Sequence, residues 1–237
     1  MLMGEEIAEK ARIMGIDLPE NALPLFQKHA RMITEWNQRL NLTRISEEEM
    51  AEKHFVDSLT VLLVPKVNDA RNAIDIGSGA GFPGIPLKVV RPDMKITLVD
   101  SLGKRVKFLE RVVRALELEG IRCYHSRAEE MGQDKGHREK YDVALARAVA
   151  SLVLLCEYLL PLVRMGGIMV ALKGPSGKEE VKEAERALDI LGGRVEDILE
   201  LSLPSGDGRQ LVVIEKVGET PRLYPRRPGM ARKDPLI

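Results

Sequence analysis

The chain contains few cysteines, few aromatic residues and no long apolar run. Two of its 237 residues are cysteine and 4% are aromatic. Cys123 and Cys156 lie in separate apolar segments and form no C-x-x-C or metal-ligand pattern, so we expect buried, reduced thiols and no metal site. No segment approaches the roughly 18 consecutive apolar residues of a membrane span. The N-terminal stretch MLMGEEIAEKA is charged rather than signal-like, so we expect a cytoplasmic protein.

The sequence also lacks an excess of charge of either sign. Its 36 basic residues balance 36 acidic ones, so total charge does not indicate a nucleic-acid partner, although a local basic patch can still bind one. Such a patch occurs in the C-terminal tail, residues 219–237. Its cations are Arg222, Arg226, Arg227, Arg232 and Lys233. Composition alone favours a solvated, disordered terminus. With no strong exposed apolar patch identifiable, we expect a monomer.

The first 70 residues show helical periodicity and no strand-like alternation. Apolar residues spaced by three and four predict one helix with a buried face. These residues are Phe26, Ala30, Ile33, Trp36 and Leu40. Ser46 followed by Glu49 predicts a capping box at the start of a later helix, whose apolar face carries Phe55, Leu59 and Leu62. We therefore expect an N-terminal helical cap over residues 1–70.

From residue 72 onward, short apolar runs alternate with helical patterns. The runs are NAIDIG, KITLVD, IRCYHS, YDVALA and GGIMVALKG, and the helices are expected near 84–91, 103–118, 151–164 and 177–191. This alternation predicts a parallel sheet covered on both faces. Two further runs, RVEDILELSL and RQLVVIEKV, are joined by the turn-like PSGDG. The result is a seven-stranded α/β sheet with an antiparallel last strand over residues 71–218. This Rossmann-like arrangement resembles the class I methyltransferases that use S-adenosylmethionine.

A glycine-rich loop follows the first predicted strand, in AIDIGSGAGFPGIPL. Its pattern is Asp75-x-Gly77-x-Gly79-x-Gly81. Glycine allows positive φ and lets a ligand approach bare backbone, at a cost of roughly 0.5–1 kcal/mol per residue. A dinucleotide-binding fingerprint needs glycine at position 82, which is Phe82, and a P-loop needs a lysine that is absent. A nicotinamide-dependent oxidoreductase is therefore disfavoured, and the spacing resembles the methyltransferase motif.

Further candidate residues lie where later strands are expected to end. Asp100 can accept both ribose hydroxyls of an adenosine, or it can cap the helix expected from Gly103. Ala128 and Glu129 follow the third strand, where this fold usually holds the adenine, although an acid is also favoured where a helix begins. Arg147 ends the fourth strand at the ligand-binding edge of the sheet. Its simpler explanation is a surface salt bridge.

The region around the fourth strand restricts the methyl acceptor. It reads ARAVAS, without the Asn/Asp-Pro-Pro-aromatic tetrad typical of enzymes that methylate exocyclic amines of adenine or cytosine. Methylation at cytosine C5 needs a nucleophilic cysteine, and both cysteines are expected in the core. An acceptor with a free lone pair, such as guanine N7, remains. Alignment of the reactants can supply most of the catalysis for such an acceptor.

Six stretches together resemble one family over nearly the whole chain, from about residue 20 to the end. They are NLTRISEEEMAEKHFVDSL, AIDIGSGAGFPGIPL, LVDSLGKRVKFLERV, RAEEM, ARAVASL and YPRRPGMARKDPL. The chain resembles the RsmG (GidB) family of bacterial 16S rRNA guanine-N7 methyltransferases. The resemblance implies methyl transfer from S-adenosyl-L-methionine to guanine 527, in the family's usual rRNA numbering, with release of S-adenosyl-L-homocysteine. The implied partner is 16S rRNA or the small ribosomal subunit.

The resemblance also implies which residues bind the two substrates. The implied cofactor contacts are Gly77, Phe82, Asp100, Ser101, Leu102, Ala128, Glu129 and Arg147, beside the loop glycines Gly79 and Gly81. Similar basic tails belong to the family's RNA-facing region, which assigns the cations of the tail to RNA.

A polar stripe in the second predicted helix forms a further candidate. Lys53, His54, Asp57 and Ser58 include i, i+3 and i+4 neighbours. A buried, hydrogen-bonded His–Asp pair is the simplest explanation. Our hypothesis is that the stripe borders the cofactor cleft and helps to hold the guanine, with Lys173 on the same rim. None of these residues is assigned a definite catalytic step.

Two other functions stay open at this point. The same fold can methylate a small molecule or a protein, since fold alone does not fix the substrate. A non-catalytic RNA-binding assembly factor could also retain the fold. A substrate affinity that does not change with salt would favour a small-molecule or protein substrate. Absence of cofactor binding would favour the non-catalytic factor.

Overall fold

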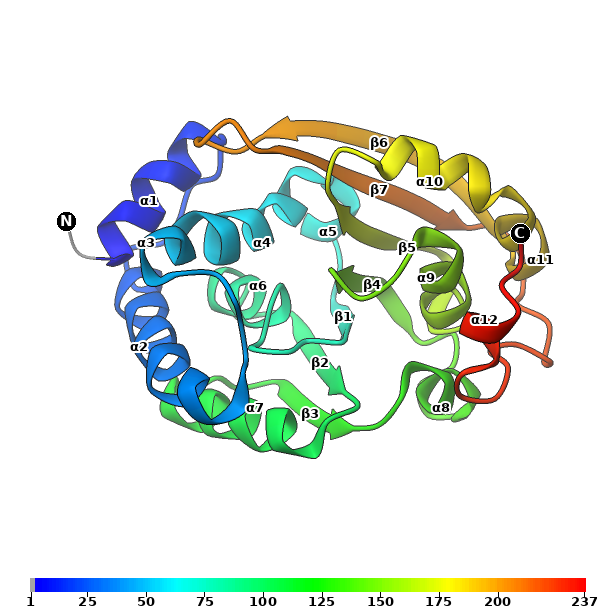
Figure 1. Cartoon of the computed structure of the whole chain (residues 1–237), viewed down its shortest axis with the longest axis horizontal. Coiled ribbons are helices and arrows are strands. Elements are labelled where there is room, and N and C mark those ends of the chain that lie inside the picture. Colours follow the sequence, from blue (N-terminus) through cyan, green and yellow to red (C-terminus); the bar gives the residue numbers. More distant parts are fainter. Residues whose placement is uncertain (1–2) are drawn as a thin grey trace.

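A seven-stranded sheet with helices on both faces forms the centre of the computed structural model, which describes residues 3–237 (Figure 1). The strands are β1 Asn72–Ile76, β2 Lys95–Asp100, β3 Ile121–His125, β4 Tyr141–Arg147, β5 Val163–Lys173, β6 Gly193–Ser202 and β7 Gly208–Lys216. Their order is β3-β2-β1-β4-β5-β7-β6. Strands β1 to β5 pair in parallel, and β7 is antiparallel to both β5 and β6. The predicted mostly parallel sheet with its reversed last strand is confirmed.

The N-terminal residues form helices, as predicted, but with more interruptions. The elements are α1 Met3–Ile13, α2 Ala22–Leu40, α3 Glu47–Met50, a π-helical turn Ala51–Val56, α4 Asp57–Leu59, a 3-10 turn Thr60–Leu63 and α5 Pro65–Asn68. Phe26 and Phe55, on the two predicted apolar faces, are fully buried, whereas Trp36, Leu40 and Leu62 are partly buried. Ser46 is the N-cap of α3, but its hydroxyl contacts the Glu49 carboxylate at 3.4 Å instead of a backbone amide. The predicted capping box is therefore incomplete.

The remaining helices lie near the predicted positions. They are α6 Gly84–Val90, α7 Gly103–Ala115, α8 Ala128–Gln133, α9 Leu152–Leu159, α10 Gly177–Glu183, α11 Glu185–Leu191 and α12 Met230–Lys233. Two predictions need correction. The helix expected over 151–164 ends at Leu159, because Pro161 cannot donate a helical hydrogen bond, and β5 begins at Val163. The helix expected over 177–191 is two helices that meet at Ala184.

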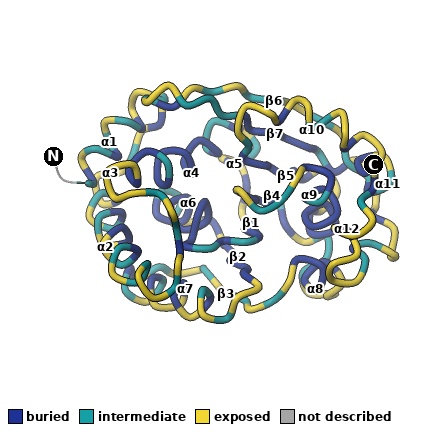
Figure 2. The backbone as a smooth tube through the Cα atoms, in the orientation of Figure 1, coloured by how far each residue is buried: buried dark blue, intermediate teal, exposed yellow. Residues whose placement is uncertain are grey.

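Each face of the sheet packs into its own hydrophobic core, and buried residues follow the strands (Figure 2). Alternate residues of one strand point to opposite faces, so Ala73 lies in one core and Ile74 in the other. The N-terminal helices fill the first core with α6 and α7, and α8, α9 and α11 cover the other face. Within residues 3–237, no helix is long and apolar enough to cross a membrane.

Candidate cofactor and substrate site

The glycine loop leaves β1 at the carboxyl edge of the sheet with bare backbone facing outward. Gly77 has φ +75° and Gly79 has φ +58°, a region that other residues rarely adopt. A Cβ at Gly77 would lie 2.7 Å from a methyl carbon of Val149, so only glycine lets the 148–150 segment cross this close. At Gly79 a Cβ would meet only the Gly77 carbonyl oxygen, at 3.8 Å. The loop therefore exposes main chain at Gly79, while at Gly77 it packs against the segment 148–150, which follows β4.

Two hollows meet at Gly77. The larger has a volume of about 750 Å³ and the smaller about 290 Å³. Of the residues predicted from the sequence, the larger is lined by Gly77, Gly79, Phe82, Arg147, Lys53, His54, Asp57 and Lys173. The smaller is lined by Gly77, Ser101, Ala128, Glu129 and Arg232. Asp100, Leu102 and Gly81 line neither hollow. The structure thus brings most of the candidate residues into one continuous region.

Asp100 holds the glycine loop against the end of β2. Its carboxylate is 3% exposed and accepts hydrogen bonds from the amides of Gly79 at 3.0 Å and Leu102 at 2.9 Å. Arg105, on α7, approaches it at 3.6 Å. Each carboxylate oxygen has a second lone pair, so these bonds leave acceptor capacity. Asp100 therefore fixes the loop through Gly79, which lines the larger hollow, and it precedes Ser101, which lines the smaller one.

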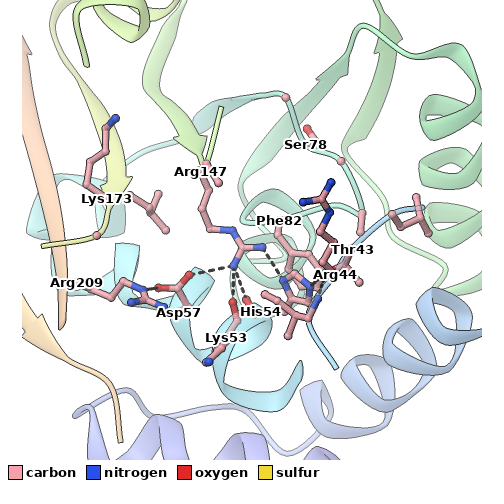
Figure 3. A pocket seen from close by; sticks show the side chains of 18 of the residues that line it. Thr43, Arg44, Lys53, His54, Asp57, Ser78, Phe82, Arg147, Lys173 and Arg209 are labelled. Atoms are coloured by element: carbon pink, nitrogen blue, oxygen red, sulfur yellow. Dashed lines mark hydrogen bonds and ion pairs between the residues drawn. The ribbon is translucent and has the colours of Figure 1, made fainter. Parts of the chain in front are cut away.

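Arg147 is the centre of a buried network rather than a surface salt bridge (Figure 3). Its guanidinium donates to the Lys53 carbonyl at 2.9 Å, to Asp57 at 3.1 Å and to His54 Nδ1 at 2.8 Å. Asp57 also accepts a hydrogen bond from Arg209 Nε at 3.0 Å. The expected direct His54–Asp57 pair is wrong, since each of them binds Arg147 instead. Burial lowers the pKa of Arg147, opposed by the charge of Asp57.

The protonation of His54 follows from its partners. Burial, and then the charge of Arg147, lowers its pKa to about 3, so the ring is neutral near pH 7. Because a guanidinium only donates, Nδ1 must accept and Nε2 must carry the proton. Nε2 then donates to the Thr43 hydroxyl at 2.7 Å, which also accepts from the Ile45 amide at 3.0 Å. The Thr43 hydroxyl proton remains available to the larger hollow, which Thr43 lines.

Aromatic packing fixes the other side of His54. Its ring stacks on Phe82, with centroids 4.5 Å apart and planes 3° from parallel. Phe82 also stacks with His29 at 5.1 Å, and the Arg147 guanidinium lies 5.0 Å from the Phe82 centroid. Burial lowers the pKa of His29 to about 4. Phe82 is thus mainly a spacer between the glycine loop and the N-terminal helices.

Lys173 lies on the rim of the larger hollow, as expected, but its ammonium group is engaged. It donates to the Ala150 carbonyl and to Glu180, each at 2.7 Å. These bonds fasten the 148–150 segment beside the glycine loop. Cys156 is buried as expected, whereas Cys123 is only partly buried, and burial raises the pKa of both thiols to about 12, so both are poor nucleophiles.

The C-terminal tail is ordered against the domain, which rules out the disordered terminus that composition alone favoured. The Arg226 guanidinium binds both carboxylate oxygens of Glu157, with its closest contact at 2.7 Å. The Gly229 amide donates to Glu129 at 3.1 Å. Glu129 also lies in the first turn of α8, the alternative raised from the sequence. Arg222, Arg227, Arg232 and Lys233 are exposed.

Sequence reasoning missed several residues of the larger hollow. Thr43, Arg105 and Arg209 line it beside the expected side chains. Thr43 carried no signal beyond its place in NLTR, next to the predicted stripe. Arg209 reaches Asp57 only because β7 runs against its neighbours, which places the start of β7 at the carboxyl edge of the parallel strands.

Comparison with solved structures shows the fold. TrmN from Thermus thermophilus matches with a TM-score of 0.52 at 17% identity, covering 70% of this chain and 53% of that one. The 16S rRNA (adenine(1408)-N(1))-methyltransferase from Catenulisporales acidiphilia matches with a TM-score of 0.53 at 15% identity, covering 68% and 92%. The class I methyltransferase fold predicted from the sequence is confirmed.

Comparison with sequences shows the family. The family model GidB, described as rRNA small subunit methyltransferase G, matches residues 22–212. A ribosomal RNA small subunit methyltransferase G from Desulforamulus reducens is 50% identical over 232 residues, or 97% of each chain. One from Pelotomaculum thermopropionicum is 48% identical over 237 residues, or 99% of each chain. The chain therefore belongs to the rRNA small subunit methyltransferase G family, as its motifs indicated.

Proposed function

We propose that this protein transfers a methyl group from S-adenosylmethionine to N7 of guanine 527 in 16S rRNA, acting as a cytoplasmic monomer. The observation that carries the proposal is the pair of hollows that both have Gly77 in their lining. The smaller hollow, with Ser101, Ala128 and Glu129, suits the adenosine of the cofactor. The larger hollow has room for the methionine end and for an inserted base.

The residues present fit this cofactor. Bare backbone at Gly79 provides space that a Cβ would occupy. Arg105 lines the larger hollow, and its buried Nε has no hydrogen-bond partner within residues 3–237. The Arg105 guanidinium also approaches Asp100 at 3.6 Å, and its positive charge beside the hollow suits the carboxylate of the methionine moiety. Asp100 lies at the end of β2, where this fold places its ribose-binding acid, and it retains acceptor capacity for the hydroxyls.

The chemistry needs alignment more than proton transfer. When bound, S-adenosylmethionine supplies an electrophilic methyl group on a positively charged sulfur. Guanine N7 attacks with its lone pair and loses no proton, so the protein must mainly hold the base in line. Both nitrogens of His54 are occupied and Asp57 is paired with two arginines, and this arrangement is compatible with an acceptor that loses no proton.

Cations near the larger hollow support an RNA substrate. Lys53, Lys173 and Arg209 line it but each pairs with a carboxylate, whereas Arg44, also on its lining, is exposed and forms no ion pair within residues 3–237. We propose that Arg44 and the exposed tail cations contact phosphates, which supply most of the sequence-independent affinity for nucleic acid. Arg226 is excluded from this role, because Glu157 occupies its guanidinium.

Methyl transfer from labelled cofactor to 16S rRNA, free or in the small subunit, tests the proposal. We expect incorporation at guanine 527, located by borohydride and aniline cleavage, which is selective for N7-methylguanine. Asp100→Ala should abolish transfer, because the loop loses its anchor and the ribose its acceptor. Asp189→Ala, at an exposed position on α11, is the matched control and should behave like the wild type.

Other outcomes would select another function. Cofactor-product binding by calorimetry without transfer to any RNA would favour a small-molecule or protein substrate. Absence of both cofactor-product binding and methyl transfer would favour the non-catalytic RNA-binding factor. RNA affinity that does not fall as salt rises would contradict the proposed phosphate contacts.

A further inference from the structure

The tail segment 225–234, which we term the C-terminal strap, is anchored by one buried ion pair. Arg226 donates to Glu157 of α9 from its backbone amide at 2.8 Å and from its guanidinium at 2.7 to 3.2 Å. Glu157 is 1% exposed. A bidentate, charge-assisted contact of this kind fixes both the position and the orientation of the arginine. The strap is therefore held firmly where it crosses α9.

Beyond this anchor, the strap passes along the smaller hollow. The Gly229 amide donates to Glu129 Oε1, and both Gly229 and Arg232 line the hollow. Ala231 is fully buried, so the short helix α12 packs against the domain on its inner side. Part of the hollow's lining thus comes from α8 and part from the strap, which contact each other through Gly229 and Glu129.

We infer that the strap is a wall of the cofactor site and that Arg226 and Glu157 are positioning residues for adenosine binding. This inference rests on the proposed function, since it takes the smaller hollow as the adenosine site. Glu129 is 5% exposed, and the Gly229 amide fixes one of its carboxylate oxygens. The other oxygen is then presented in one orientation, suited to the exocyclic amine of an adenine. Release of the strap frees the Glu129 side chain and opens the hollow.

The inference assigns the tail a role that differs from RNA contact. Its cations divide into two groups by burial. The Arg226 guanidinium is paired with the buried Glu157, whereas Arg227 and Lys233 are exposed and form no ion pair within the described chain. The effect of Arg226 should therefore fall on the cofactor, and the effect of the exposed cations on RNA.

Calorimetry with S-adenosylhomocysteine on the full chain, without RNA, tests the inference. We expect Arg226→Gln to weaken binding at least tenfold and to raise KM for the methyl donor by a similar factor. Its kcat at saturating donor should change less than twofold, and its KM for RNA should change less than its KM for the methyl donor. Arg164→Gln, which breaks an Arg–Asp pair with Asp142 away from both hollows, is the matched control and should leave affinity unchanged.

A second variant avoids leaving Glu157 as an unpaired buried charge, which could prevent folding. Gly229 has φ +85° and no atom within 4 Å of a built Cβ, and Gly206, in the β6–β7 turn, has φ +93° and equally open surroundings. Gly229→Ala should weaken cofactor-product binding severalfold, whereas Gly206→Ala, with the same backbone strain, should not.

The outcomes separate the two proposals. If the wild type does not bind S-adenosylhomocysteine, the proposed function fails. If the wild type binds it and Arg226→Gln and Gly229→Ala bind it equally well, only the role of the strap fails. A raised KM for RNA with an unchanged KM for the methyl donor would overturn the inference in favour of an RNA-binding tail.

Discussion

Asp57 neutralises two arginines beside the larger hollow, and its replacement gives a sharp stability prediction. The carboxylate accepts from Arg147 and Arg209, and the three side chains are 9%, 13% and 22% exposed. Asp57→Asn removes the charge and turns an amide NH2 toward one guanidinium. Removing one partner of a buried ion pair costs about 3–5 kcal/mol. Because this network borders an open hollow, we expect the lower end, about 3 kcal/mol.

The control is the same substitution at an exposed Arg–Asp pair. Asp93 contacts Arg91 and is 66% exposed, so Asp93→Asn should cost at most about 1 kcal/mol. Urea unfolding at pH 7.5 measures both variants. In the double variant with Arg209→Met, part of the loss should return, because one unpaired cation is gone. Equal losses for Asp57→Asn and Asp93→Asn would refute the view that Asp57 is a buried counter-ion.

Three further predictions concern the same hollow. Gly79→Ala should weaken S-adenosylhomocysteine binding about tenfold, because the added methyl group fills part of the hollow. The control Gly15→Ala, also at positive φ and with nothing within 4 Å of a built Cβ, should lower only the stability. Equal binding by both variants would contradict the role of the Gly79 backbone in holding the cofactor. The folded pKa of His54, about 3, lies below its unfolded value, so the unfolded state binds more protons and stability falls as pH drops below about 6.5. His54→Gln should remove about 2 kcal/mol of the loss between pH 7.5 and 5, measured by urea unfolding; an unchanged pH dependence would show that His54 is not held neutral. Thr43→Val should raise KM for RNA while Thr43→Ser restores it, because only the hydroxyl keeps the donor; equal kinetics of both variants would exclude that role.

The elements that the sequence predicted well are those set by short-range patterns. The bounds of strands β1 to β4 were predicted to within a residue, because a near-continuous apolar run bounded by glycine or polar residues fixes where a buried strand begins and ends. The glycine loop and the acid at position 100 were identified because their spacing along the chain is itself the motif. The π-helical turn at Ala51–Val56 was not predicted, since its apolar pattern matches that of an α-helix.

The contacts that the sequence could not predict join residues far apart in the chain. Arg147 binds Asp57 across 90 positions, and Arg209 binds the same carboxylate across 152. A donor and an acceptor at such separations give no periodic signal. Composition was equally uninformative about the tail, because an arginine that pairs with Glu157 looks the same in sequence as one that binds phosphate.

The reversed strand β7 has a consequence for how the protein is made. It carries Arg209 to Asp57, and the turn before it brings the Ser205 amide to Glu52 at 2.8 Å. A ribosome delivers the chain from the N-terminus, so early segments can begin to fold before later ones emerge. Glu52, in the π-helical turn, must wait for 153 further residues before Ser205 exists, and Asp57 must wait for 152 before Arg209 exists. The rim of the larger hollow is therefore completed only near the end of synthesis, and a nascent chain that stops before residue 205 leaves this corner unfinished.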